Sequence, residues 1–379
     1  MVWNEEQREL RRGLARWGEA LSAKHLEWDE RAEFPRAKWG SVRECGVLRL
    51  PFPREHGGLD QDLTTTMYVL EELGYRCEDG GLNFAITTHM VGVGIPLLRF
   101  GTDEQRGRYL SGVVEGERLG GHAITEPDSG SDAFAMRTTA VRDGACYVLN
   151  GRKTFTSNGP AGDLFVVYAM TNKQAGALGG VSAFLVPRDA PGFTTGPAIK
   201  KMGLRSAPMC DLVFEDCRIP AANLIAREGM GFAILDHVMK WEILCSFIVS
   251  VGEMQRRLEK CVSYAKTRKQ FGQAIGSFQA IAHKLVDMRI GVEVSREALY
   301  RAGHKVQLNE NATVDVAIAK LLASEHNRSS ALEAIQIFGG YGYMTEYGLE
   351  KELRNAVAGT IYSGTSETQR NRIARMMGL

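Results

Sequence analysis

The sequence predicts an α+β protein whose helices lie in its first and last parts and whose β-strands lie between them. Apolar residues recur at helical spacings of three and four over the first 120 residues and again after residue 232. Between these regions, short runs of β-branched and aromatic residues alternate with turn residues. We therefore expect an N-terminal α-helical domain over 1–120, a middle antiparallel, barrel-like β-domain over 121–232 and a C-terminal four-helix bundle over 233–379.

The helices of the first region are predicted from amphipathic stripes and from helix-start signals. Leu10, Leu14, Trp17 and Leu21 predict one helix over Glu5–Ala23. Further helix signals lie at 34–46, at 62–73 and at Thr102, which has the residue type and the acidic neighbours of an N-cap.

The strands of the middle region are predicted where apolar runs are bounded by turns. They are expected at Cys146–Leu149, Arg152–Ser157, Leu164–Ala169, Val181–Val186 and Asp211–Phe214. Arg142–Ala145 is expected to form a turn before the first of these strands. Asn150-Gly151 is the dipeptide most typical of a two-residue hairpin, so we expect the chain to turn there as well.

Long helical periods return in the last region. They predict helices over Phe232–Lys266, Phe278–Gln307 and Val314–Phe338, and a last helix from about Thr365. Three helices of this length are typical of a helix bundle.

Composition excludes several classes of protein. The 379 residues include 46 Lys and Arg against 45 Asp and Glu, so the chain carries no field that would attract nucleic acid or an acidic membrane. The seven cysteines form no C-x-x-C pair and no zinc spacing, so we expect free thiols and no metal. The start is charged at once and has no apolar signal run, which favours the cytoplasm. The uncharged stretch Gly80–Leu98 contains polar residues, glycines and a proline, as a core segment does.

No dinucleotide-binding or phosphate-binding loop of the G-x-G-x-x-G or Walker type is present. The chemistry must therefore lie in segments that are unremarkable when each is taken alone. Each could be a solvated turn or a helix end. These segments are Ile124–Asp132 (ITEPDSGSD), Arg268–Gly272 (RKQFG), Gln336–Gly342 (QIFGGYG) and Ile361–Glu367 (IYSGTSE).

Together and in this order, the four segments resemble those of the acyl-CoA dehydrogenase family, and the resemblance covers essentially the whole chain. The resemblance implies the acyl-CoA dehydrogenase fold, in the same order of helices, β-domain and helices. It also implies a non-covalent FAD, α,β-dehydrogenation of an acyl thioester and a homotetramer, less often a dimer. Such an enzyme is an oxidoreductase that acts on a CH–CH bond.

The resemblance also implies which residues contact FAD. Thr125 matches the family residue near the flavin pyrimidine, Phe155-Thr156-Ser157 matches the family's W-I-T strand over N5, and Arg268 matches the arginine on the pyrophosphate. Taken singly, Arg268 could equally end a helix in a salt bridge, and Ser157 could be an ordinary strand serine. The full set implied is His122, Ile124, Thr125, Ser131, Phe155, Thr156, Ser157, Arg268, Phe271, Gln279, Gln336, Gly339, Gly340, Thr365, Ser366 and Glu367, with Gln336, Gly339 and Gly340 reaching FAD from a neighbouring subunit.

The chain departs from the family pattern at Ser363. Most members have at this place the glutamate that removes the substrate α-proton, and a serine hydroxyl is a far weaker base. The isovaleryl branch instead carries its base on the first long helix of the bundle. Counting back without gaps from Phe271 places that base at Glu242, which is set among apolar residues. We expect Glu242 to take the α-proton, flavin N5 to take the β-hydride, and the backbone N–H of Ser363 to bind the thioester carbonyl.

Two other interpretations of Glu242 come from the residues alone. The carboxylate could be exposed on one helical face, or it could pair with Lys240 or Arg268. The position and the missing loop carboxylate favour the catalytic role.

The residues beside Glu242 point to the kind of thioester. Ile243 and Lys240 stand where members that use CoA have an arginine and an aspartate, so a polar contact to CoA is lost. Trp241-Glu242 together with Ser363 resembles the branch that acts on acyl or aminoacyl groups, such as prolyl groups, on acyl carrier proteins in secondary-metabolite biosynthesis. The expected substrate pocket contains His89, Met90, Trp241 and Cys245.

Three alternatives remain open at this point. The substrate could be a free short or branched acyl-CoA. The fold also supports flavin oxidases and monooxygenases, so the electron acceptor could be a flavoprotein or O₂. The missing loop glutamate also fits a degenerate, non-catalytic member. The acyl group and the choice between dimer and tetramer are not determined by these residues.

Overall fold

The computed structural model describes residues 2–379. Its N-terminal part consists of short helices packed around a longer one. The helix expected over 5–23 is broken near Arg16-Trp17, so that α1 and α2 are separate. Asn4 caps α1 with a reciprocal capping box. The helices are α1 (Glu5–Ala15), α2 (Gly18–Ser22), α3 (His25–Arg31), α4 (Arg36–Glu44), α5 (Leu63–Arg76), α6 (Gly80–His89), α7 (Ile95–Phe100), α8 (Asp103–Gln105) and α9 (Ser111–Val114).

A π-helical turn, Met90–Gly94, joins α6 to α7, so that Gly80–Phe100 forms one apolar helical stretch. It is the one helix among residues 2–379 that is long and apolar enough to cross a membrane, and 83% of its most apolar window is buried inside the structure. This burial identifies the stretch as a core helix, as expected from its polar residues and glycines.

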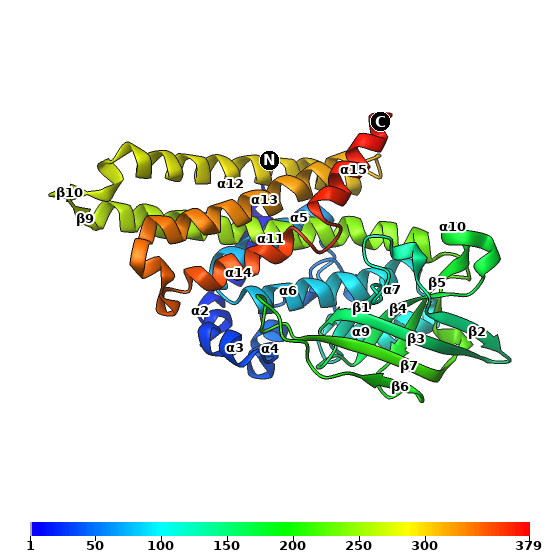
Figure 1. The fold of residues 1–379 in the computed structure, drawn as a ribbon. Helices are drawn as coiled ribbons and strands as arrows, with labels where there is room; N and C mark the ends of the chain where they lie inside the picture. Colours follow the sequence, from blue (N-terminus) through cyan, green and yellow to red (C-terminus); the bar gives the residue numbers. More distant parts are fainter. Residues whose placement is uncertain (1) are drawn as a thin grey trace.

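The middle part is one eight-stranded sheet in the order β6-β7-β3-β2-β4-β5-β8, with β1 beside β4 (Figure 1). Most neighbours are antiparallel, as expected, but β1 and β2 each run parallel to β4. A short helix, α10 (Gly176–Gly180), precedes β5. The strands are β1 (Gly120–Ala123), β2 (Thr139–Asp143), β3 (Cys146–Ser157), β4 (Leu164–Met170), β5 (Val181–Pro187), β6 (Phe193–Thr195), β7 (Met209–Pro220) and β8 (Leu224–Ile225).

The expectation of a hairpin at Asn150-Gly151 is wrong. β3 continues without a turn through this dipeptide, and the chain turns only at the earlier of the two expected places, at Gly144-Ala145 between β2 and β3. The register with β7 shifts between Leu149 and Gly151. A Cβ at Gly151 would lie 2.7 Å from the Cα of Thr138, so this glycine serves a close backbone approach at a β-bulge.

The C-terminal part is a bundle of long helices (Figure 1). A small hairpin of β9 (Lys269–Gln270) and β10 (Gln273–Ala274) projects from the end of the bundle, between its first two helices. The three long helices agree with the expected ranges, whereas α14 was not anticipated. The helices are α11 (Gly231–Thr267), α12 (Gln279–Gln307), α13 (Thr313–Phe338), α14 (Leu349–Gly359) and α15 (Ser366–Met376).

Two glycines allow α5 and α11 to cross almost backbone to backbone. A Cβ at Gly74 would lie 1.9 Å from the carbonyl oxygen of Val249, and one at Gly252 would lie 2.0 Å from that of Glu71. α11 also contacts β5 and α10. The close crossing with α5 therefore fixes the position of α11 relative to the sheet. It therefore positions the residues that α11 presents to the sheet.

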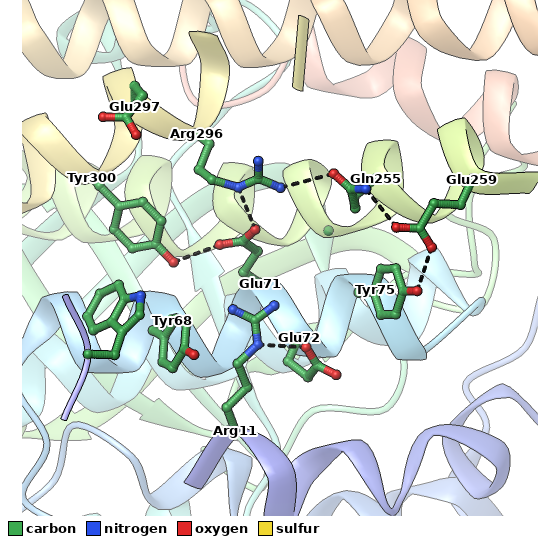
Figure 2. A pocket seen from close by; sticks show the side chains of 12 residues that line it. Arg11, Tyr68, Glu71, Glu72, Tyr75, Gln255, Glu259, Arg296, Glu297 and Tyr300 are labelled. Carbon is green, nitrogen blue, oxygen red and sulfur yellow. Dashed lines mark hydrogen bonds and ion pairs between the residues drawn. The ribbon is translucent and has the colours of Figure 1, made fainter. Parts of the chain in front are cut away.

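A polar network surrounds this crossing and joins it to α12 (Figure 2). The buried carboxylate of Glu71 accepts hydrogen bonds from Arg296 Nε at 2.8 Å and from the Tyr300 hydroxyl at 2.7 Å. Glu72 accepts from Arg11 Nε at 2.7 Å. Burial and the charge of Glu71 raise the pKa of Tyr300 far above its ordinary value, so the hydroxyl keeps its proton. The network thus ties the N-terminal helices to the bundle.

Candidate active site

Glu242 and Ser363 lie in contact, although 121 positions separate them in the sequence. The Ser363 hydroxyl donates a hydrogen bond to Glu242 Oε1. Lys240, one of the partners considered for Glu242, pairs instead with Asp236 at 2.7 Å. The Glu242 side chain is 18% exposed, so it is sheltered without being sealed from solvent.

The loop that carries Ser363 is held on both sides. Ser363 and Gly364 have φ values of 53° and 86°, and Gln369 Nε2 donates to the Ser363 carbonyl at 2.9 Å. The Tyr362 ring stacks on Phe247 of α11 with ring centres 5.2 Å apart. These contacts direct the Ser363 hydroxyl at Glu242, so the side chain takes part in the site as well as the backbone that the sequence suggested.

The second carboxylate oxygen of Glu242 faces His122 on β1. The distance from His122 Nδ1 to Glu242 Oε2 is 3.6 Å, and the imidazole is 4% exposed. His122 Nε2 lies 3.2 Å from the Tyr168 hydroxyl on β4. Sequence reasoning placed His122 among the FAD residues and missed Tyr168. The only signal for Tyr168 was a single hydroxyl within an otherwise apolar strand.

The loop that carries Thr125 and Ser131 is anchored by a buried ion pair. Lys153 Nζ on β3 donates to Glu126 Oε1 at 2.8 Å and to the Ile124 carbonyl at 3.0 Å. Glu126 also accepts from the backbone N–H groups of Arg137 and Thr138. Burial, partly offset by Glu126, lowers the pKa of Lys153 to about 8. Sequence reasoning did not single out this pair.

The Phe155-Thr156-Ser157 segment presents groups that a bound cofactor could use. Phe155 is 58% exposed and has a φ of 55°, which is uncommon for a bulky residue. The Thr156 hydroxyl is buried and has no hydrogen-bond partner among the described residues. A buried polar atom without a partner is costly, so this hydroxyl fits a site that a polar ligand completes.

A second group of expected FAD residues lies at the other end of α11. Arg268, Gly339 and Gly340 line a hollow between the end of α11 and the turn after α13. Phe271 at the tip of the β9–β10 hairpin is 93% exposed. Gln279 and Gln336 lie at the start of α12 and near the end of α13, the two helices that border this region.

Arg268 follows the last turn of α11 and lies 26 residues beyond Glu242, which places the two about 39 Å apart along the helix. The structure therefore does not bring all the expected FAD residues together within one chain. Thr365, Ser366 and Glu367 belong to the Glu242 end, because the Thr365 hydroxyl caps α15 directly after the Ser363 loop. Ser366 Oγ donates to Glu325 Oε1 at 2.6 Å.

Three of the four expected pocket residues are fully buried. His89 has both ring nitrogens engaged, Nε2 with the Val113 carbonyl and Nδ1 with the Gly120 N–H, each at 2.8 Å. Burial lowers the pKa of His89 to about 4, so the ring is neutral near pH 7. Met90 and Cys245 are 0% exposed and lie in the main hydrophobic core. Only Trp241 is partly exposed.

Models of three acyl-CoA dehydrogenase domains match the chain: the N-terminal domain at residues 4–117, the middle domain at 121–217 and the C-terminal domain at 229–378. The chain belongs to the acyl-CoA dehydrogenase family. It is 40% identical over 341 residues to an L-prolyl-[peptidyl-carrier protein] dehydrogenase of a Serratia species, covering 90% of this chain and 88% of that one.

Solved structures within the acyl-CoA dehydrogenase fold resemble the whole chain. The prolyl acyl carrier protein oxidase AnaB has a TM-score of 0.97 and 41% identity, and each chain is fully covered. PigA with FAD and proline has a TM-score of 0.97 and 36% identity, covering 100% of this chain and 99% of that one. The α+β architecture of helices, sheet and helices expected from the sequence is thereby confirmed.

Proposed function

We propose that this acyl-CoA dehydrogenase family member is an FAD-dependent oxidoreductase that dehydrogenates the α,β bond of an acyl or aminoacyl thioester on a carrier protein. The observation that carries the proposal is the contact between Glu242 and Ser363. A carboxylate from α11 reaches the loop position where most of the family has its base. The likeness to enzymes named for prolyl carrier proteins supports the carrier-bound substrate.

The residues present fit FAD. Three features would hold the cofactor: the unpartnered Thr156 hydroxyl, the anchored loop of Thr125 and Ser131, and the capped start of α15 at Thr365. When bound there, FAD would supply the acceptor for the β-hydride. The segments would hold it through His122, Ile124, Thr125, Ser131, Phe155, Thr156, Ser157, Thr365, Ser366 and Glu367.

The remaining FAD residues act on a neighbouring subunit. Arg268, Phe271, Gln279, Gln336, Gly339 and Gly340 lie too far along the bundle to serve the site that contains Glu242 of the same chain. We infer a homo-oligomer, with a tetramer favoured over a dimer, in which the protruding β9–β10 hairpin reaches the neighbour's cofactor. In this assembly Arg268 would bring a cation to the pyrophosphate.

Proton removal falls to Glu242 and polarisation of the thioester to Ser363. An acyl thioester loses its α-proton more readily when its carbonyl oxygen is hydrogen-bonded, because charge develops on that oxygen. The backbone N–H of Ser363 is assigned this role, while its hydroxyl holds Glu242 Oε1. The carboxylate then takes the α-proton as a general base.

The surroundings of Glu242 favour a carrier-bound thioester over free CoA. Ile243, at the place of the arginine found in members that use CoA, is 1% exposed and packs in the core. Lys240 is paired with Asp236 and is not free to contact CoA.

We further infer that the domains span 1–120, 121–232 and 233–379 and that the enzyme works in the cytoplasm. Of the expected pocket residues, Trp241 is partly exposed and could contact a substrate directly. His89, Met90 and Cys245 are buried and would support the residues that line the pocket.

The proposal is tested by mass spectrometry of thioesters incubated with the FAD-loaded enzyme. The same acyl or aminoacyl group, prolyl first, is offered on a carrier protein and on CoA. A loss of two mass units on the carrier protein supports the proposal. A loss on CoA alone supports the free acyl-CoA alternative, and no loss on either thioester contradicts dehydrogenation of these groups. Repeating the assay with O₂ or with an electron-transferring flavoprotein identifies the electron acceptor.

A further inference from the structure

His122 is placed by the sheet where it faces both the base and a buried hydroxyl. In the parallel pair of β1 with β4, His122 lies opposite Val166, so Tyr168, two residues on, projects from the same face. This face of β4 packs against the helical core, and α11 brings Glu242 to it. Gly92 in the π-helical turn makes room for the ring, since a Cβ there would lie 2.7 Å from that of His122.

The contacts on the two sides of the imidazole indicate which ring nitrogen carries the hydrogen. An ionised Glu242 can face His122 Nδ1 at 3.6 Å without repulsion only when Nδ1 carries a hydrogen. The Tyr168 hydroxyl is buried, and burial together with the charge of Glu242 raises its pKa far above the ordinary value. It therefore keeps its proton and can donate it to Nε2 at 3.2 Å, and in that arrangement the ring hydrogen lies on Nδ1.

Three other titratable groups packed around His122 and Glu242 do not change charge near neutral pH. Burial raises the pKa of Cys245 on α11 and of Tyr362 on the loop, so both stay protonated. Burial lowers the pKa of His89 on α6 to about 4, so it stays neutral. Burial also raises the pKa of Glu253, which lies three turns farther along α11 and also influences Tyr362.

We propose that His122, oriented by Tyr168, is a positioning residue that presents its Nδ1–H to Glu242 and keeps the carboxylate ionised before each proton abstraction. This inference rests on the proposed function, because it assumes that Glu242 is the base. Stabilising the carboxylate lowers the pH at which the base becomes protonated. Removing the donor would therefore move the loss of base activity to higher pH.

The experiment measures the base without the redox step. The holoenzyme is reduced beforehand, so that hydride cannot be transferred, and exchange of the α-hydrogen of the prolyl carrier-protein thioester is followed in D₂O by mass spectrometry against pH. His122→Phe keeps a ring but no donor. His122→Asn places an amide N–H near the position of Nδ1, and Tyr168→Phe removes the group that orients the ring. Thermal unfolding of each variant reports whether the fold is intact.

The exchange rate is expected to fall on the acid side of the pH profile, where the base becomes protonated. We expect His122→Phe to raise the midpoint of this fall by about one pH unit, so that the exchange rate at pH values below the midpoint is roughly tenfold lower than in the wild type. Tyr168→Phe should shift the midpoint in the same direction by less, and His122→Asn should return it towards the wild-type value. An unchanged midpoint in His122→Phe would mean that His122 only packs β1 against the core. Glu242→Gln separates the two proposals: wild-type exchange in that variant overturns the proposed base itself.

Discussion

Glu242 is the single side chain on which the proposed chemistry depends. Glu242→Gln keeps the size of the side chain and an acceptor for the Ser363 hydroxyl, but it removes the base. We expect fold and FAD content to survive and flavin reduction by the substrate to slow by about 10²- to 10⁴-fold. Stopped-flow spectroscopy of the flavin absorbance measures this rate. Reduction at the wild-type rate would require another base.

Ser363 is proposed to act through both its backbone N–H and its side-chain hydroxyl, and one substitution separates the two roles. Ser363→Ala leaves the backbone N–H in place and removes the hydroxyl that donates to Glu242 Oε1. A hydrogen bond to a charged group contributes about 1.5–3 kcal/mol when buried. Because this site is partly open, we expect a loss of roughly tenfold in the rate of flavin reduction, which corresponds to about 1.4 kcal/mol. No change in the rate would limit the role of Ser363 to its backbone.

At the scale of elements, the crossing of α5 and α11 decides where Glu242 lies relative to the sheet. Gly74→Ala would put a methyl group 1.9 Å from the Val249 carbonyl oxygen and force the helices apart. We expect a loss of about 1–3 kcal/mol in the free energy of unfolding and weaker FAD binding. Urea denaturation measures the first and the absorbance of bound flavin the second.

Gly13→Ala is the matched control for this prediction. Gly13 lies inside α1, and a Cβ there would meet nothing within 4 Å. Alanine has the higher helix propensity, so this variant should be as stable as the wild type or up to about 1 kcal/mol more stable. Equal stability of both variants would show that the helices can separate at no cost.

The elements differ in how far the sequence predicts them. The long helices α11, α12 and α13 are confirmed because their apolar period runs over many turns. The Asn150-Gly151 turn is wrong because a glycine in a strand can serve a bulge as well as a hairpin, and only the approach of Thr138 distinguishes the two. The parallel pairing of β1 with β4 depends on contacts between distant segments, which local patterns do not report.

The candidate site divides in the same way. Glu242 and Ser363 could be predicted from the sequence, because Ser363 replaces the glutamate of most family members and Glu242 stands where another branch has its base. The structure places the two side chains in contact. The link from Glu242 through His122 to Tyr168 joins three elements and has no motif of its own. It becomes visible only when the register of the sheet is known. The buried Lys153–Glu126 pair could not be predicted from the sequence either, because it too joins separate segments and has no motif of its own.

At the scale of the whole molecule, the two ends of α11 are expected to serve different active sites. Arg268→Ala should lower FAD retention, because the cation on the pyrophosphate is lost across a subunit interface. Lys266→Ala, two residues earlier and also exposed, is the control and should retain FAD as the wild type does. Flavin content after gel filtration is the measurement. Full, tight occupancy in Arg268→Ala would contradict the assignment of Arg268 to the cofactor.

The length of α11 makes cofactor affinity a property of the assembly. If each FAD needs Glu242 and its neighbours from one chain and Arg268 from another, an isolated subunit holds only half of a site. Binding of FAD and association of subunits are then thermodynamically linked, so FAD strengthens association and dilution promotes release of FAD. The specific activity of the enzyme should fall on dilution and recover when either protein or FAD is added back.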